Sequence, residues 1–162
     1  MTDTTTGITY SMNGTVAAPT WRVEAGPSSV HLVSASIATT SNTDNYVVVP
    51  EAGILASVDF SSLAALAAHD SNYITWTITN LGQAGAGSTA MLAAADTNTT
   101  KATGGAALSA NTKRSLVLHG TAANLVVAAG DRLLIRAAAT GTLAGAVTVP
   151  VYMLRFTPTA QV

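Results

Sequence analysis

The strongest pattern in the chain is an alternation of apolar and polar residues, which is the period of a half-buried β-strand. It is strictest over residues 72–82, where Ile74, Trp76 and Ile78 share one side and hydroxyl-bearing side chains occupy the other. Successive side chains of a strand point to opposite faces. We therefore expect Trp76 to lie in the core of the protein.

Further segments repeat this pattern at intervals of roughly 10–14 residues, with no convincing long helix among them. On the strand that begins at Gly53, the alternation places Ile54, Ala56, Val58 and Phe60 inward. Residues 61–72 fit either a short helical turn or a loop. The predicted strands are residues 28–37, 45–50, 53–60, 72–82, 89–96, 112–120, 132–140 and 143–158, with a weak strand within 97–106.

The segments between these strands are rich in turn-forming residues. Loops or turns are predicted over residues 39–45, 83–89 and 128–131. About eight to ten short strands separated by turns are typical of an antiparallel sandwich or barrel. The sequence therefore predicts an all-β fold.

The first 27 residues differ from the rest, because they are polar and show only weak periodicity. Apolar residues are spaced along them at Tyr10, Met12, Val16 and Trp21. We interpret residues 1–27 as an extended N-terminal arm and residues 28–162 as the β-sandwich domain. The alternative for residues 20–25 is the first strand of the sandwich itself.

Charged residues make up only 9% of the chain, and the formal net charge is −1. An ordinary globular domain has roughly 25% charged residues. Seven scattered basic residues give no electrostatic footprint for nucleic acid, and no apolar run is long enough for a transmembrane helix. A surface with so few charges favours association with other chains, since charge is what usually keeps soluble monomers apart.

Candidate catalytic residues do not form a recognisable motif. His31, His69 and His119 lie in different segments, and none has the neighbours of a nucleophile–base pair. The carboxylates are dispersed, cysteine is absent, and no metal-ligand spacing occurs. We expect a protein that is not an enzyme and that holds no metal and no cofactor, although calcium bound by loop aspartates stays open.

The aromatic residues leave carbohydrate binding open as an alternative, because exposed aromatic rings can stack on sugars. The side chains available for such a surface are Tyr10, Trp21, Tyr46, Tyr73, Trp76 and Tyr152.

Three segments resemble a known group of proteins: Asn72–Gly87, Lys113–Thr142 and, within the latter, Ala128–Ala137, which reads AAGDRLLIRA. The last is similar to the turn-then-strand signature of viral β-sandwiches. Together with the low charge and the abundance of Thr, Ala and Gly, these segments resemble the head decoration (cement) and minor capsid proteins of tailed bacteriophages. The resemblance covers residues 28–157.

This resemblance implies a jelly-roll-like sandwich that binds the outside of an icosahedral head, favoured as a homotrimer, with an N-terminal arm that reaches the shell or a neighbouring subunit. We therefore expect a non-enzymatic virion protein on the outer surface of the capsid, made in the host cytoplasm, with the major capsid protein as its partner. Its contact residues would be Tyr10, Met12, Val16 and Trp21. The alternative is a carbohydrate- or receptor-binding module of a phage fibre or tail.

Overall fold

The computed structural model describes residues 9–12, 21–24 and 27–158, and these residues form an all-β structure. Its two helices are single 3-10 turns, η1 (Asp96–Asn98) and η2 (Ala122–Leu125), and neither is long and apolar enough to cross a membrane. Two strands precede the sandwich, β1 (Thr9–Met12) and β2 (Trp21–Glu24). The sandwich strands are β3 (Ser28–Val33), β4 (Thr43–Val48), β5 (Gly53–Ser61), β6 (Tyr73–Asn80), β7 (Thr89–Ala90), β8 (Arg114–Leu116), β9 (Val126–Val127), β10 (Arg132–Thr140) and β11 (Val151–Pro158).

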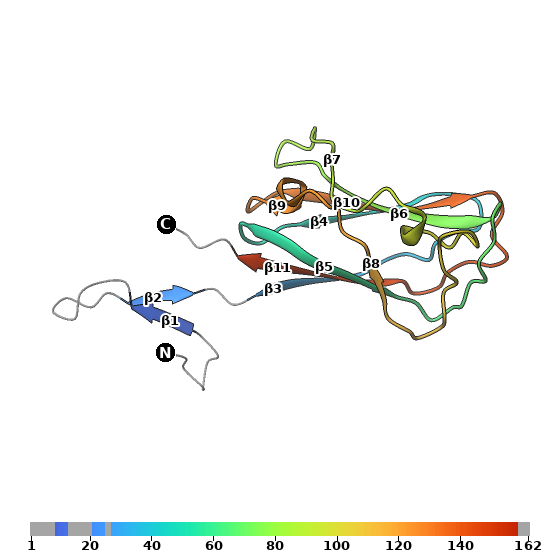
Figure 1. The fold of residues 1–162 in the computed structure, drawn as a ribbon, viewed down its shortest axis with the longest axis horizontal. Coiled ribbons are helices and arrows are strands. Elements are labelled where there is room, and N and C mark those ends of the chain that lie inside the picture. Colours follow the sequence, from blue (N-terminus) through green and yellow to red (C-terminus); the bar gives the residue numbers. More distant parts are fainter. Residues whose placement is uncertain (1–8, 13–20, 25–26, 159–162) are drawn as a thin grey trace.

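The nine strands from β3 to β11 build two antiparallel sheets that face each other (Figure 1). One sheet has the order β4-β10-β6-β7. The other has the order β3-β11-β5-β8, and β9 pairs with β5 on the same edge as β8. The chain crosses between the sheets at β3, β4, β5 and β6 in turn, so most neighbours in a sheet are distant in sequence. This order is the double Greek key of a jelly roll, which confirms the predicted fold class.

The core lies between the sheets and is built by alternating residues of both. On β6 the predicted inward residues Ile74, Trp76 and Ile78 are buried, as expected. The neighbouring strand β10 buries Ile135 and Ala137 opposite two of them. Large side chains from β5 and β11 close the core from the other sheet. The largest buried side chains are Trp76, Tyr152, Phe60, Phe156, Ile37, Leu55, Ile74, Ile78, Met91, Leu133, Ile135 and Leu154.

One predicted face is partly wrong. Val58 and Phe60 of β5 point inward as expected, but Ile54 and Ala56 are exposed and Leu55 is buried instead. The cause is a β-bulge, because Arg155 pairs with Ser57 while the next residue of β11 pairs with Leu55. Ala56 is the extra residue, and one extra residue moves every preceding side chain to the opposite face.

Several predicted strands are shorter than the pattern suggested: the strand expected over 28–37 ends at Val33, the strand expected over 112–120 is only β8, and no strand forms within 97–106. The strand expected over 89–96 consists only of β7, and the strand expected over 143–158 begins at Val151. Of residues 61–72, Ser61 still belongs to β5 and residues 62–72 form a loop rather than a helical turn, in which Leu66 makes a single bridge to Leu108. In each case the chain leaves one sheet to reach another segment, which a local pattern does not reveal.

The predicted turn at 128–131 is confirmed and has a defined chemistry. The carboxylate of Asp131 accepts hydrogen bonds from the backbone N–H of Ala128 at 2.9 Å and from the side-chain amide of Asn80 at 2.9 Å. Gly130 has a φ of 83°, a conformation that favours glycine. These bonds fix the point at which β10 enters the sheet beside β6.

Strands β1 and β2 form a separate two-stranded antiparallel sheet. Tyr10 pairs with Val23, and Met12 pairs with Trp21. Neither strand is hydrogen-bonded into the two sheets of the jelly roll, so residues 21–24 do not form the first strand of the sandwich.

Candidate functional site

Three of the four predicted contact residues lie in the N-terminal hairpin. Tyr10 and Met12 are in β1 and Trp21 is in β2, and the register sets Met12 opposite Trp21. Val16 lies outside the described residues. The structure therefore brings two of these positions together in one strand pair.

The three histidines lie in different elements and do not form one catalytic group. His31 is exposed on β3, with its Nε2 atom 3.5 Å from the hydroxyl of Ser29. The Nδ1 atom of His69 accepts a hydrogen bond from the backbone N–H of Ser71, and the Nδ1 atom of His119 accepts one from the backbone N–H of Thr121. Each histidine thus has a local partner in a different element.

The aspartates of residues 27–158 take part in structural contacts. Asp59, 5% exposed, accepts a hydrogen bond from the Ser115 hydroxyl at 2.7 Å and lies 3.5 Å from Lys113 Nζ. The Nη1 atom of Arg155 lies 3.9 Å from its other oxygen. Hydrogen bonds from Thr103 lower the pKa of Asp70. In residues 9–12, 21–24 and 27–158, no group of three acidic, histidine or cysteine side chains is placed to hold a metal ion.

The aromatic residues of the sandwich do not form a continuous stacking surface. Trp76 and Tyr152 are both buried in the core, whereas Tyr73 is half-buried and Tyr46 is 60% exposed. Tyr46 shares the outer side of β4 with Val48, which is also 60% exposed. This small apolar patch lies on the edge strand β4, next to the ion pair between Arg136 and Asp44. The hydrogen bond from Arg136 and its positive charge lower the pKa of Asp44.

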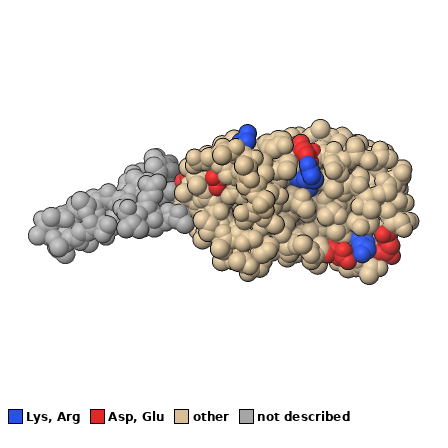
Figure 2. Space-filling model, turned by 90° about the horizontal axis from the view of Figure 1, so that it is seen from above, with Lys and Arg blue, Asp and Glu red and all other residues tan. Residues whose placement is uncertain are grey.

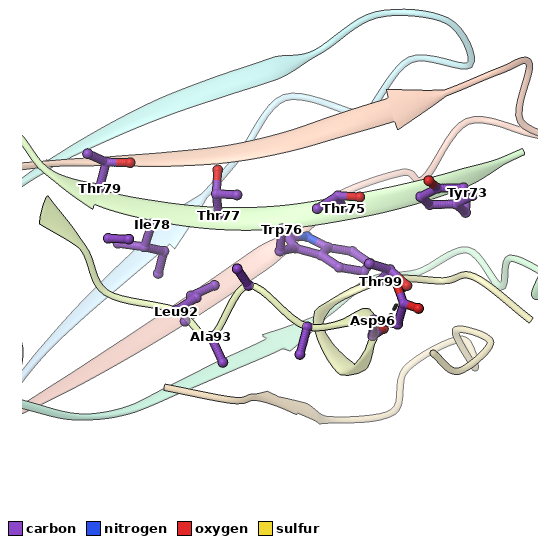
Figure 3. A pocket seen from close by; sticks show the side chains of 13 residues that line it. Tyr73, Thr75, Trp76, Thr77, Ile78, Thr79, Leu92, Ala93, Asp96 and Thr99 are labelled. Carbon is purple, nitrogen blue, oxygen red and sulfur yellow. Dashed lines mark hydrogen bonds between the residues drawn. The ribbon is translucent and has the colours of Figure 1, made fainter. Parts of the chain in front are cut away.

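A cavity of about 390 Å³ opens where the chain leaves the edge of β6 (Figure 3). The backbone N–H of Met91 still donates to the carbonyl of Ile78, but the next residues turn to the edge of the other sheet. There Ala93 donates to Val117, and His119 donates to Met91. Figure 3 shows Trp76 and Ile78 pointing into the space between β6 and this segment, while Thr75, Thr77 and Thr79 point to the other side.

The far wall of this cavity is held by a buried asparagine. The side-chain amide of Asn98 donates to the carbonyls of Ala93 at 2.9 Å and Val117 at 2.8 Å, and its oxygen accepts the N–H of Val117 at 2.8 Å. Asn98 therefore acts as a bridge between two chain segments that lack a continuous ladder. Small side chains dominate this wall, where Ala93, Ala94 and Ala95 follow one another.

Trp76, which lines the cavity, also packs against Arg114. The guanidinium carbon of Arg114 lies 5.0 Å from the centre of the indole ring, a distance suited to a cation–π contact. Its nitrogen atoms donate to the carbonyls of Ala106, Thr97 and Thr99. Burial lowers the pKa of Arg114, and these contacts hold the loop after η1 against β6.

Charged side chains are few and scattered over the face seen in Figure 2. Several of those described are paired within the chain, as in the contacts between Lys101 and Asp96 at 3.3 Å and between Arg136 and Asp44 at 2.6 Å. Over the described residues, such pairing leaves no extended field of one sign to attract a highly charged partner.

The sequence matches no family model and no curated protein, and no solved structure matches the fold.

The cavity beside β6 was not predicted from the sequence. The sequence pattern predicts a continuous strand over 89–96, and such a strand would cover the edge of β6. The run Ala93–Ala95 is the one local indication that the strand ends early, because three equal small residues break the alternation of a half-buried strand. Nothing in the sequence indicates that Arg114 contacts Trp76.

Proposed function

We propose that this chain is a non-enzymatic structural protein of a tailed-bacteriophage virion, which decorates the outer surface of the head. Its partner in this proposal is the major capsid protein, and it assembles on the shell as a homotrimer. The jelly roll supports the proposal in general terms, since viral capsid domains use this architecture, but lectins and other domains use it as well. The argument therefore depends on features of this chain.

The observation that carries the proposal is the N-terminal hairpin. Strands β1 and β2 pair with each other and take no part in the two sheets, which are complete without them. A segment that contributes nothing to the sandwich ladder and yet contains Tyr10, Met12 and Trp21 is suited to bind another chain. Aromatic residues and methionine are enriched at the centres of protein interfaces.

The surface chemistry supports a structural role in the same way. A decoration protein needs complementarity to a repeated lattice and no reactive centre. The few described charges are largely paired within the chain, and apolar side chains such as Val33, Tyr46 and Val48 are exposed on the edge strands. Weak contacts repeated over several shell subunits gain affinity through effective concentration, so no single strong site is required.

The proposal can be tested by sedimenting the purified chain with empty heads of the phage whose genome encodes it. The full chain should sediment with the heads and saturate at a fixed ratio to the major capsid protein. A variant lacking residues 2–18 should bind at least about tenfold more weakly, because it loses most of the arm. His31→Ala, an exposed substitution on β3, serves as the matched control and should bind like the parent chain.

Two outcomes would contradict the proposal. If the full chain stays in the supernatant at every concentration, it does not decorate the head. If it is retained on a glycan column but not on heads, the function is carbohydrate or receptor recognition instead.

A further inference from the structure

The two sheets are joined along one side of the sandwich and end freely on the other. On the joined side, the N–H of Met91 donates to the carbonyl of Ile78 in one sheet. Two residues later, the N–H of Ala93 donates to the carbonyl of Val117 beside the other sheet. The edge strands on this side are short, with two residues in β7 and three in β8. The opposite edges are β4 and β3, which have six residues each and are the long edges of the described sandwich.

Strand β4 presents backbone groups that have no partner among the described residues. Its register with β10, and the hydrogen bond of 2.9 Å from the N–H of Val49 to the carbonyl of Asp131, show which of its residues turn toward β10. In an antiparallel ladder the groups of alternate residues point to opposite sides of the strand. The N–H and C=O groups that point away from the sheet therefore belong to Asp44, Tyr46 and Val48. No described residue donates to these groups or accepts from them.

The same edge carries exposed apolar side chains and no unpaired charge. Tyr46 and Val48 are each 60% exposed, and among the described large apolar side chains only Val33 is more exposed. Natural edge strands are usually protected by lysine, proline or a bulge. The one charged residue of β4 is Asp44, and Arg136 neutralises it with hydrogen bonds of 2.7 Å from Nε and 2.6 Å from Nη2. The edge is thus suited to pair with another strand.

We propose that β4 pairs with β4 of a second copy of this chain, as an antiparallel ladder around a two-fold axis. Only one register uses every free group of both edges. In this register Tyr46 faces Tyr46 of the second copy, and Asp44 faces Val48. Each of these residue pairs exchanges two backbone hydrogen bonds. The sheets that contain β4 in the two copies then form one continuous sheet.

The side chains fit this register. The two Tyr46 rings lie beside each other at the axis, and aromatic cross-strand pairs stabilise a ladder. The two Asp44 carboxylates are about 13 Å apart along the ladder, because Val48 is four positions from Asp44. That separation exceeds the Debye length of about 8 Å at physiological ionic strength. Each carboxylate also keeps its contact with Arg136, so charge does not oppose the pairing.

A second copy is the occupant for two reasons. The contact is self-complementary, as a two-fold contact requires, so no other sequence is needed. A single strand pair is also smaller than a stable interface of roughly 1,200–2,000 Å², so it is weak between free molecules and gains strength where copies are held side by side, as on a decorated shell. The choice of occupant thus rests on the proposed function, whereas the open edge does not. Because the contact is two-fold, it adds to the contacts of the proposed homotrimer and does not form them.

Hydrogen exchange followed by NMR tests the open edge. In dilute solution the amides of Tyr46 and Val48 should exchange much faster than those of Asn45 and Val47, which face β10. An amide of Tyr46 that is as protected as that of Val47 would show that the edge is covered within one copy, and the proposal would fail.

Disulfide trapping tests the register, because the chain contains no cysteine of its own. Asp44→Cys chains mixed with Val48→Cys chains should form a cross-linked dimer under mild oxidation, since facing residues of a ladder lie within the Cα separation that a disulfide spans. The mixture should cross-link at least about tenfold faster than either variant alone, because each cysteine is about 13 Å from the same cysteine of the second copy. The matched control is a mixture of Ser29→Cys and Val33→Cys, two exposed positions with the same spacing on β3, which should cross-link no faster than its components.

A charge at the axis tests the contact from the protein side. Tyr46→Lys in both cysteine variants should return the rate to that of the single variants, because two like charges then face each other. Thr77→Lys, at an exposed position on β6 within the same sheet, is the matched control and should leave the rate of the mixture unchanged.

Three results would overturn the proposal: equal cross-linking of the β4 mixture and its components, a rate that Tyr46→Lys does not lower, or faster cross-linking of the β3 mixture, which would assign the contact to β3. If the β4 mixture cross-links as expected while the chain fails to sediment with heads, the decoration role is refuted and the contact between copies stands.

Discussion

The indole nitrogen of Trp76 donates a hydrogen bond to the hydroxyl of Tyr152 across 3.2 Å, and this bond joins the two sheets at the centre of the jelly roll. Trp76 belongs to β6 and Tyr152 to β11, and both side chains are at most 1% exposed. The ring of Phe60 on β5 packs against both, with centroids 5.0 Å and 5.1 Å away. The Tyr152 hydroxyl thus gives the buried indole N–H its acceptor.

Trp76→Ala should destabilise the fold by roughly 3–5 kcal/mol, the usual range for removal of a buried large aromatic side chain. The substitution opens a cavity beside Phe60, leaves the Tyr152 hydroxyl without its donor and removes the surface on which Arg114 lies. Urea denaturation of the parent and variant chains measures the difference.

Thr77→Ala is the control for this experiment, because Thr77 is the exposed neighbour on the same strand. Its free energy of unfolding should differ from that of the parent by about 0.5 kcal/mol or less. A loss below about 1 kcal/mol in Trp76→Ala would mean that the indole ring faces outward and that the register of β6 is wrong.

Tyr152 makes stability depend on alkaline pH. Burial raises the pKa of its hydroxyl to about 12, whereas the unfolded chain ionises near 10. The stabilisation is therefore complete below pH 10 and is lost as the pH rises to about 12, because only the unfolded chain releases this proton in that interval. A difference of this size corresponds to about 2–3 kcal/mol. Urea melts between pH 9 and pH 11.5 should show the decline.

Tyr152→Phe separates this effect from other ionisations. The variant should be less stable than the parent at pH 7 by about 1–3 kcal/mol, since the indole N–H loses its acceptor. It should, however, lose less stability than the parent between pH 9 and pH 11.5. Tyr46→Phe, at an exposed position, should keep the alkaline decline of the parent. A decline of equal size in Tyr152→Phe would assign it to other groups.

The fold could be predicted from the sequence wherever a strand stays within one sheet. Strands β6 and β10 show this, because their alternation over Ile74, Trp76, Ile78 and Ile135 follows the buried face that both form. The alternation misleads at β5, where the bulge at Ala56 shifts the parity of every residue before it. A bulge depends on the partner strand, so no pattern on β5 alone reveals it.

The candidate site depends on long-range contacts and was correspondingly harder to predict. The cavity exists because Met91 accepts a hydrogen bond from His119 and the chain turns away from β6. Asn98 and Arg114 hold the surrounding segments through contacts with residues more than ten positions away in the sequence. Local periodicity carries no information about such contacts. The arm assigned from Tyr10, Met12 and Trp21 does form its own strand pair, but its binding role stays a prediction.

Deletion of residues 2–18 should leave the sandwich folded. The two sheets of the jelly roll contain neither β1 nor β2, so the ladder hydrogen bonds of the nine sandwich strands survive the deletion. The thermal midpoint of the truncated chain, measured at low concentration, should lie within a few degrees of that of the parent. Cooperative unfolding lost on truncation would show that the hairpin is part of the folding unit.

Self-association of the full chain should be only weakly sensitive to salt. Salt screens interactions between exposed charges, and this chain offers few of them. Arg136 is already paired with Asp44, and Lys113 and Arg155 both lie beside Asp59, so little charge is left for contacts between copies. Apolar contacts and hydrogen bonds between strand edges must then supply most of the association energy, and sulfate should strengthen the apolar part.

Sedimentation between low salt and about 0.5 M salt should show one assembly, favoured as a trimer, whose mass is a multiple of 16.3 kDa. A monomer at micromolar concentration in every buffer would refute self-association in solution and leave assembly to a surface that arrays the copies. An oligomer that dissociates as salt rises would instead show that ion pairs hold the interface, and Arg136→Gln and Arg155→Gln would then identify which charges are responsible.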